Sequence, residues 1–259
     1  MMNYALYAIL IASILFVGIL LLLEVGRRAG KRRIAKDAKA DMAGIGVIDA
    51  AVFALLGLLL AFTFSGAGTR FDSRRQLIVK ETNDIGTAYL RVDLLPASAQ
   101  SALREKFRQY VDARIATFKA SDLRAAREEI ARATKMQGEI WTQSLAATRT
   151  ADVHPDAAKL LLPALNSMID ITTTQTMAMQ THPPIIVFVM LGVLTLVSSV
   201  LAGYGMAHGR WRNWIHILCF ATVMSVSFYV ILDLEYPRLG WIRVDAFDQA
   251  LVDLRQTMN

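Results

Sequence analysis

Acidic side chains in apolar segments are the first residues of this sequence that could do chemistry. Asp49 lies about one turn inside an almost uncharged run at 45–65, and Asp233 and Glu235 lie near the end of another at 214–234. Acids inside a membrane are costly and commonly mark ion or proton pathways. Stabilisation of a helix N-terminus explains Asp49 about equally well. Asp233 and Glu235 are more typical of interfacial anchoring than of an ion site.

One helical face would connect Asp49 with apolar and basic residues. At about 100° per residue, this face carries Asp49, Phe53, Leu56, Leu60, Thr63, Ala67, Arg70 and Arg74. Around an axis, its apolar part would form a pore neck of Leu56, Leu60 and Phe64. Its basic part would form a ring at the pore mouth, made by Arg70 and Arg74. Pores use such constrictions and rings for gating and ion selection, although ordinary helix packing is favoured by spacing alone.

The stretch that holds this face continues beyond the apolar run as helix-compatible sequence. A single helix from Val47 to Leu95 would be a rod about 70 Å long, which crosses a bilayer and extends well beyond it. Gly66 and Gly68 are the two positions that would interrupt it.

Apolar residues spaced by seven indicate a coiled-coil-like seam along the second part of this rod. The seam consists of Phe71, Ile78, Ile85 and Val92, with Glu81 at an interleaved position. Glu81 and Arg74 are seven residues apart and could form a partly buried ion pair or network, within the rod or between subunits. Solvated charges on the flank of the helix are the alternative. The seam is therefore a candidate assembly device.

Hydropathy predicts the elements that position these residues. The chain has 259 residues, 54% hydrophobic, with a mean hydropathy of +0.39 and a formal charge of +6. Four almost uncharged runs are each long enough to span a bilayer: residues 4–23, 45–65, 185–207 and 214–234. The first is too long in its apolar core for a signal peptide and lacks a charged flank, so we interpret it as a retained anchor.

The expected fold is all-α: a polytopic membrane protein with four transmembrane helices and a helical extramembrane domain inserted between spans two and three. Residues 1–65 would hold spans one and two with a short basic loop at 24–43. Residues 66–182 would form the helical domain, which begins with the rod. Residues 183–236 would hold spans three and four, and residues 237–259 an amphipathic tail.

Charges in the short loops predict the orientation. Residues 24–43 contain seven Lys or Arg, and the loop AHGRWRNW between spans three and four contains Arg210 and Arg212. Short basic loops are cytoplasmic as a rule, so the helical domain is expected outside the cytoplasm. Basic residues after span two, such as Arg70 and Arg75, favour the opposite orientation. A topology signal explains the first loop, and binding to anionic lipids is the alternative.

Several function classes are disfavoured. The single cysteine, Cys219, lies in an apolar run, which leaves no disulfide framework and no cysteine-based zinc site. The four histidines are scattered, and we find no phosphate-binding loop, nucleophile elbow or zinc-protease motif. Residues 66–182 are too poor in aromatic residues to suggest nucleic-acid binding. We expect no enzyme, no metal and no cofactor.

Four segments resemble the bacterial bestrophin-like membrane-protein family. They are GLLLAFTFSGAGTRFDSRRQLIVKETNDIGTAYLRVDLLP at 57–96, YVDAR at 110–114, LNSMIDI at 165–171 and LDLEYPRLGWIRVD at 232–245. The resemblance implies four spans, a helical insertion, and a distant relation to bestrophins, which are pentameric anion channels with a pore lined by span two. It implies a bacterial inner membrane and a homo-oligomer, with the pentamer favoured. No acidic cluster resembles the bestrophin calcium clasp, so calcium gating is not expected.

Three functional hypotheses follow. The first is a homo-oligomeric ion channel that conducts small anions through a central pore lined by span two. The alternative is a non-conducting oligomeric membrane protein whose helical domain binds a partner or senses a ligand. The second alternative is a proton or cation pathway that involves Asp49. The expected partners are the lipid bilayer, further copies of the chain and small inorganic ions, and not nucleic acid.

Overall fold

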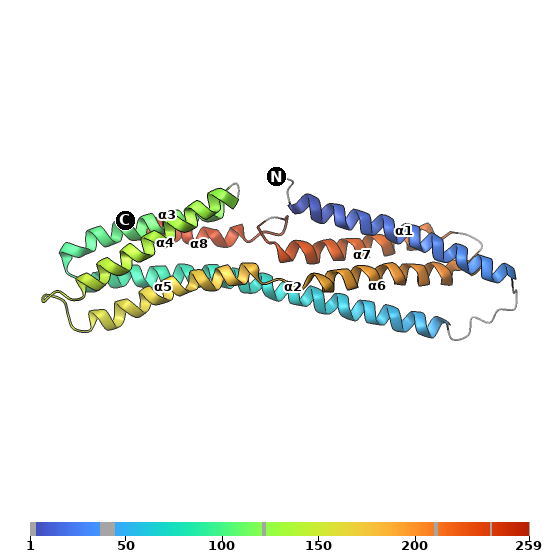
Figure 1. The fold of residues 1–259 in the computed structure, drawn as a ribbon, viewed down its shortest axis with the longest axis horizontal. Coiled ribbons are helices and arrows are strands. Elements are labelled where there is room, and N and C mark those ends of the chain that lie inside the picture. Colours follow the sequence, from blue (N-terminus) through green and yellow to red (C-terminus); the bar gives the residue numbers. More distant parts are fainter. Residues whose placement is uncertain (1–3, 37–44, 121–122, 210–211, 239, 259) are drawn as a thin grey trace. The chain divides into compact units, whose positions relative to one another are not determined.

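The computed structural model describes residues 4–36, 45–120, 123–209, 212–238 and 240–258. Within these ranges the chain is all-helical and contains no strand, which confirms the predicted fold class (Figure 1). By length and apolar composition, four helical segments are able to cross a membrane: Leu6–Lys36, Gly46–Leu94, Ala157–Gly205 and Trp214–Glu235. Residues 37–43 of the predicted loop at 24–43, and Arg210 of the second basic loop, lie outside the described ranges.

The chain divides into two compact units. We call Met1–Phe71 with His182–Arg243 the membrane unit, and Asp72–Thr181 with Val244–Asn259 the helical unit. The long helix α2, Ile45–Leu90, contributes residues to both. Gly66 and Gly68 lie inside α2 without ending it.

The membrane unit contains α1 (Tyr4–Lys36), the first part of α2, α6 (Ile185–Gly205) and α7 (Trp214–Glu235), with the short 3-10 helix η2 (Met206–His208) between the last two. Helix α1 packs along α6 and α7. Two glycines bring α1 and α6 close together, because a Cβ at Gly26 would lie 2.0 Å from the Val200 carbonyl oxygen, and one at Gly203 2.0 Å from that of Leu23. Small residues at helix interfaces are the usual device for close packing in membranes.

The helical unit contains the second part of α2, the 3-10 helix η1 (Arg91–Leu94), α3 (Ala97–Lys119), α4 (Leu123–Ala147), α5 (Ala157–Gln180) and α8 (Asp245–Thr257). Apolar residues at helical spacing give each helix a face that it buries in a common core. Phe107, Tyr110, Ile140 and Leu165 are completely buried there. Burying one such side chain stabilises the unit by about 1.5–3 kcal/mol.

Candidate functional site

The face of α2 that was expected to line a pore is buried or partly buried within the chain. Leu56 is only 3% exposed and belongs to the apolar core of the membrane unit, with Leu60 packed against it. Phe53 contacts Phe220 of α7 edge to face, with ring centroids 6.2 Å apart. Phe64, by contrast, is 49% exposed. The expected neck residues therefore differ in environment, and Leu56 already has its packing partners within one chain.

A different face of α2 is exposed. Leu58 and Phe62 are 52% and 66% exposed, and their spacing of four residues places them on one side of the helix. The small or polar residues Ala54, Ser65 and Thr69 continue this exposed line. In its most apolar window only 6% of α2 is buried, against 22–33% for the other three candidate spans. Among the four candidate spans, α2 therefore has the smallest share of residues buried by its own chain.

Arg70 is held by a buried carboxylate. Its Nε donates hydrogen bonds to the two carboxylate oxygens of Glu235, at 2.9 and 3.1 Å, and its Nη2 pairs with the same group. Glu235 comes from the last turn of α7 and is completely buried. A Cβ at Gly66 would lie 3.3 Å from Arg70 Nη1, so this glycine gives the guanidinium room to fold back along α2.

His182 extends the same cluster. Its Nδ1 lies 3.5 Å from Glu235 Oε2, and its ring stacks on Tyr236 with centroids 4.4 Å apart. His182 and Tyr236 follow the ends of α5 and α7. No local pattern in the sequence indicates that His182 meets Glu235, because 53 residues separate the two.

Asp233 organises the segment that follows α7. It is completely buried and accepts hydrogen bonds from the backbone amides of Trp241, at 3.0 Å, and Ile242, at 2.7 Å. Gly240 is needed beside it, because a Cβ there would lie 1.6 Å from Asp233 Oδ1. Asp233 and Glu235, interpreted from the sequence as interfacial anchors, thus each have hydrogen-bond partners inside the chain.

Arg74, the second residue of the expected basic ring, binds the end of a neighbouring helix. Its Nε and Nη2 donate to the carbonyl oxygens of Ala178 and Thr181, at 3.2 and 3.0 Å, and the residue is 7% exposed. Helix ends leave carbonyl groups without intrahelical partners, and a cation there also compensates the helix dipole. Arg70 and Arg74 are thus both engaged within the chain.

The expected seam lies largely inside the helical unit. Ile78 is 3% exposed, and Glu81, Ile85 and Val92 are completely buried, whereas Phe71, which belongs to the membrane unit, is partly buried. Other helices of the same chain cover Glu81, Ile85 and Val92. Burial of these positions therefore requires no second subunit.

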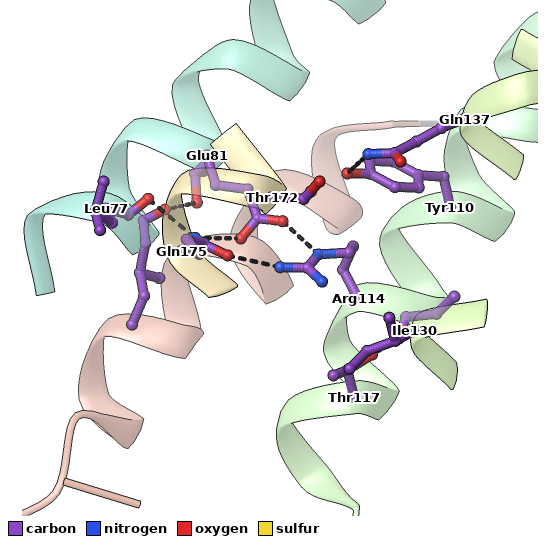
Figure 2. A network of polar contacts seen from close by, with 12 residues as sticks. Leu77, Glu81, Tyr110, Arg114, Thr117, Ile130, Gln137, Thr172 and Gln175 are labelled. Atoms are coloured by element: carbon purple, nitrogen blue, oxygen red, sulfur yellow. Dashed lines mark hydrogen bonds and ion pairs between the residues drawn. The ribbon is translucent and has the colours of Figure 1, made fainter. Parts of the chain in front are cut away.

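Glu81 forms its ion pair with Arg114 of α3 rather than the expected pair with Arg74 (Figure 2). Arg114 also donates to Gln175 of α5 at 2.7 Å, and Gln175 in turn donates to Glu81 at 2.8 Å. The three side chains close a ring of contacts between α2, α3 and α5. Arg114 follows Tyr110 and Val111 at helical spacing, so it lies on the buried side of α3, and this spacing is the signal in the sequence for a buried partner.

The electrostatics of this cluster favour the ion pair. Burial by itself would lower the pKa of Arg114, but the charge of Glu81 and the hydrogen bond to it raise that pKa overall. Burial raises the pKa of the neighbouring Tyr110, and the negative charge of Glu81 adds to the effect. The Tyr110 hydroxyl accepts a hydrogen bond from Gln137 at 3.1 Å. Arg114 therefore stays charged and Tyr110 neutral over the ordinary pH range.

Asp49 occupies the first part of α2 and is partly buried. Within the described ranges its Oδ1 is enclosed and has no hydrogen-bond partner, and no hydrogen bond or ion pair joins Asp49 to Asp233. In the same ranges, no group of three His, Cys, Asp or Glu side chains is placed to hold a metal ion. The candidate site thus consists of the long helix α2 and its two buried ion pairs, Arg70–Glu235 and Glu81–Arg114.

Comparisons with known proteins agree with this architecture. A model of the bestrophin-like domain matches residues 12–246. The fold is similar to crystal structures of a bacterial bestrophin homolog from Klebsiella pneumoniae, with 12% identity, 93% of this chain and 98% of that chain covered, and a TM-score of 0.63. A mutant of that homolog gives a TM-score of 0.65 at 12% identity, with 92% and 98% covered. Functionally curated proteins give no significant match. The chain belongs to the bestrophin-like family.

Proposed function

We propose that this protein is a homo-oligomeric channel, assembled as a pentamer, that conducts small anions through a central pore lined by α2. Family membership and the shared fold support a channel of the bestrophin type. The observation that carries the proposal is the exposed face of α2. A membrane helix that is packed by its own chain on one side only, and is the least buried of its four candidate spans, has a surface to offer to other copies of the chain.

The exposed face also suggests which residues form the neck. Leu56 is committed to the core of its own subunit, so we move the proposed constriction to Leu58 and Phe62. Residues two apart on a helix point in nearly opposite directions, which separates Leu56 from Leu58. The exposed polar side chains of Ser65 and Thr69 follow the apolar pair and would line the wider end of the path.

The preference for anions rests on the resemblance to bestrophins and on the basic balance of the chain. Arg70 keeps 29% of its side chain exposed while paired with Glu235, so part of its positive charge faces outward. A cationic group near the wider end would favour anions at short range.

Flux measurements on reconstituted protein test the proposal. In liposomes with a chloride gradient, Phe62→Ala and Leu58→Ala should raise chloride flux several-fold, because a wider and less apolar neck hydrates more easily. Leu218→Ala is the matched control, since this leucine of α7 is also exposed, at 44%, but lies on another helix. Its flux should equal that of the unaltered protein.

Subunit number and ion flux, measured on the same preparations, can also contradict the proposal. Five copies per particle in native mass spectrometry are expected. Absence of ion flux in the unaltered protein and in both neck variants, with intact oligomers, would overturn the proposal and favour the non-conducting alternative.

A further inference from the structure

A basic pocket lies in the membrane unit, where η2 and the start of α7 meet the last part of α1. Arg27 and Lys31 of α1 line one side of it, and Arg212 and Asn213 line the other. Met206 and Ile217 add apolar surface. The pocket thus combines three cationic side chains, one amide and an apolar wall.

Positive charge exceeds negative charge around this pocket. Glu24 is bound by Arg27 and Arg28, each at 2.8 Å, and by Arg212 at 3.1 Å. Three arginines therefore share one carboxylate in this part of the described chain, and Lys31 adds a fourth positive charge to the pocket lining. A single carboxylate cannot compensate four cations, so the cluster favours an additional anion.

Close helix packing holds the cations in place. A Cβ at Gly26 would lie 2.0 Å from the Val200 carbonyl oxygen, and one at Gly30 would lie 2.5 Å from the Ala207 Cβ. These two glycines are spaced by four, as in interfaces where membrane helices approach closely. Arg27 and Lys31 each follow one of these glycines directly. The close helix contact at the glycines therefore also fixes the backbone positions of Arg27 and Lys31.

The surroundings of the pocket suit the membrane–water interface. The guanidinium of Arg212 lies over the ring of Trp214, 5.4 Å from its centroid. Trp214 and Ile215 are 53% and 74% exposed, which gives apolar surface directly beside the cations. Tryptophan is enriched at the level of lipid headgroups, and basic pockets between transmembrane helices are suited to acidic lipid headgroups.

We infer that this pocket binds the phosphate-bearing headgroup of an acidic phospholipid. Lys31, Arg212 and Arg27 contact the headgroup oxygens, and the acyl chains lie along the apolar surface that begins at Trp214 and Ile215. The bound lipid neutralises the surplus charge and ties the start of α7 to α1. The inference does not depend on ion conduction.

Native mass spectrometry of the full-length protein in a neutral detergent tests the inference. The delipidated protein is titrated with phosphatidylglycerol, and in parallel with phosphatidylcholine or inorganic phosphate. We compare the unaltered chain with Lys31→Gln/Arg212→Gln. The control is Arg32→Gln/Arg33→Gln, which removes the same charge from exposed positions of α1 that do not line the pocket.

The expected result is preferential retention of phosphatidylglycerol over phosphatidylcholine. Its affinity should fall about tenfold or more in Lys31→Gln/Arg212→Gln, because each basic residue near a lipid surface contributes about 1 kcal/mol, and should change little in the control.

Equal losses in both variants would overturn the inference, since binding would then follow total charge. Equal retention of the two lipids would overturn it as well. Binding of inorganic phosphate with no preference for the acidic lipid would show a soluble anion instead and reject the lipid assignment.

Discussion

Arg70 and Glu235 are 165 residues apart in the sequence, yet the guanidinium of the first holds the completely buried carboxylate of the second. The pair joins α2 to the last turn of α7, beside the segment that Asp233 organises. A buried carboxylate is costly unless it is paired. Arg70 therefore supplies the cation that the buried carboxylate of Glu235 requires.

Removing Arg70 should destabilise the membrane unit. Arg70→Met leaves the Glu235 carboxylate buried without its main partner, and we expect a loss of about 3 kcal/mol in the free energy of unfolding. Arg70→Met/Glu235→Met removes both charges and should recover most of that stability. Thermal unfolding in detergent measures both. Equal losses in the single and double variants would mean that the ion pair is not the stabilising feature.

Alkaline pH should weaken the helical unit through Tyr110. The folded-state pKa of Tyr110 is raised, so its stabilising contribution is complete below the unfolded pKa of about 10 and is lost as the pH rises through the folded value. Between pH 8 and 11, Tyr110→Phe should show a smaller decrease of melting temperature than the unaltered protein. Tyr7→Phe is the control, because Tyr7 is 47% exposed. If both variants keep the original slope, Tyr110 does not carry this effect.

Close packing of α1 and α6 should tolerate no side chain at Gly203. A Cβ there would lie 2.0 Å from a backbone oxygen, so Gly203→Ala forces the helices apart and should lower the melting temperature by several degrees. Gly192→Ala, in the same helix, meets nothing within 4 Å and should be neutral or slightly stabilising. Indistinguishable melting temperatures for the two variants would contradict the observed packing.

Gly240 should be as necessary as Asp233 for the segment after α7. Gly240→Ala would drive a methyl group into the Asp233 carboxylate and break its hydrogen bonds to the amides of Trp241 and Ile242. We expect faster cleavage by added protease between α7 and α8 in Gly240→Ala and in Asp233→Ala. Gly205→Ala, which meets nothing within 4 Å, serves as the control. Unchanged cleavage in both variants would show that these contacts do not order the segment.

Neutralising Asp49 distinguishes the hypothesis of an anion channel from that of a proton or cation pathway. The carboxylate is partly buried near the start of α2, away from the proposed neck in the sequence. If the proposed anion pore is correct, Asp49→Asn should leave chloride flux in liposomes within about twofold of the unaltered value. A selective loss of proton or potassium flux in that variant would instead support the pathway through Asp49.

Hydropathy in the sequence by itself determined the all-α class and the four apolar segments. A segment that crosses a bilayer must satisfy its own backbone hydrogen bonds, so a long uncharged run predicts a helix without reference to the rest of the chain. The motifs around YVDAR and LDLEYPRLGWIRVD likewise indicated the family, because family resemblance is carried by local residue patterns.

Tertiary structure decided which side of each helix is buried and which charges pair. Residues 45–65 are apolar on almost every side, so periodicity does not distinguish the packed face, with Leu56, from the exposed face, with Leu58 and Phe62. The sequence likewise does not show which cation pairs with a given buried carboxylate. Glu81 lies two turns from Arg74 on the same side of its helix. The packing of α3 against α2 brings Arg114 to Glu81 instead, and a buried carboxylate requires such a partner.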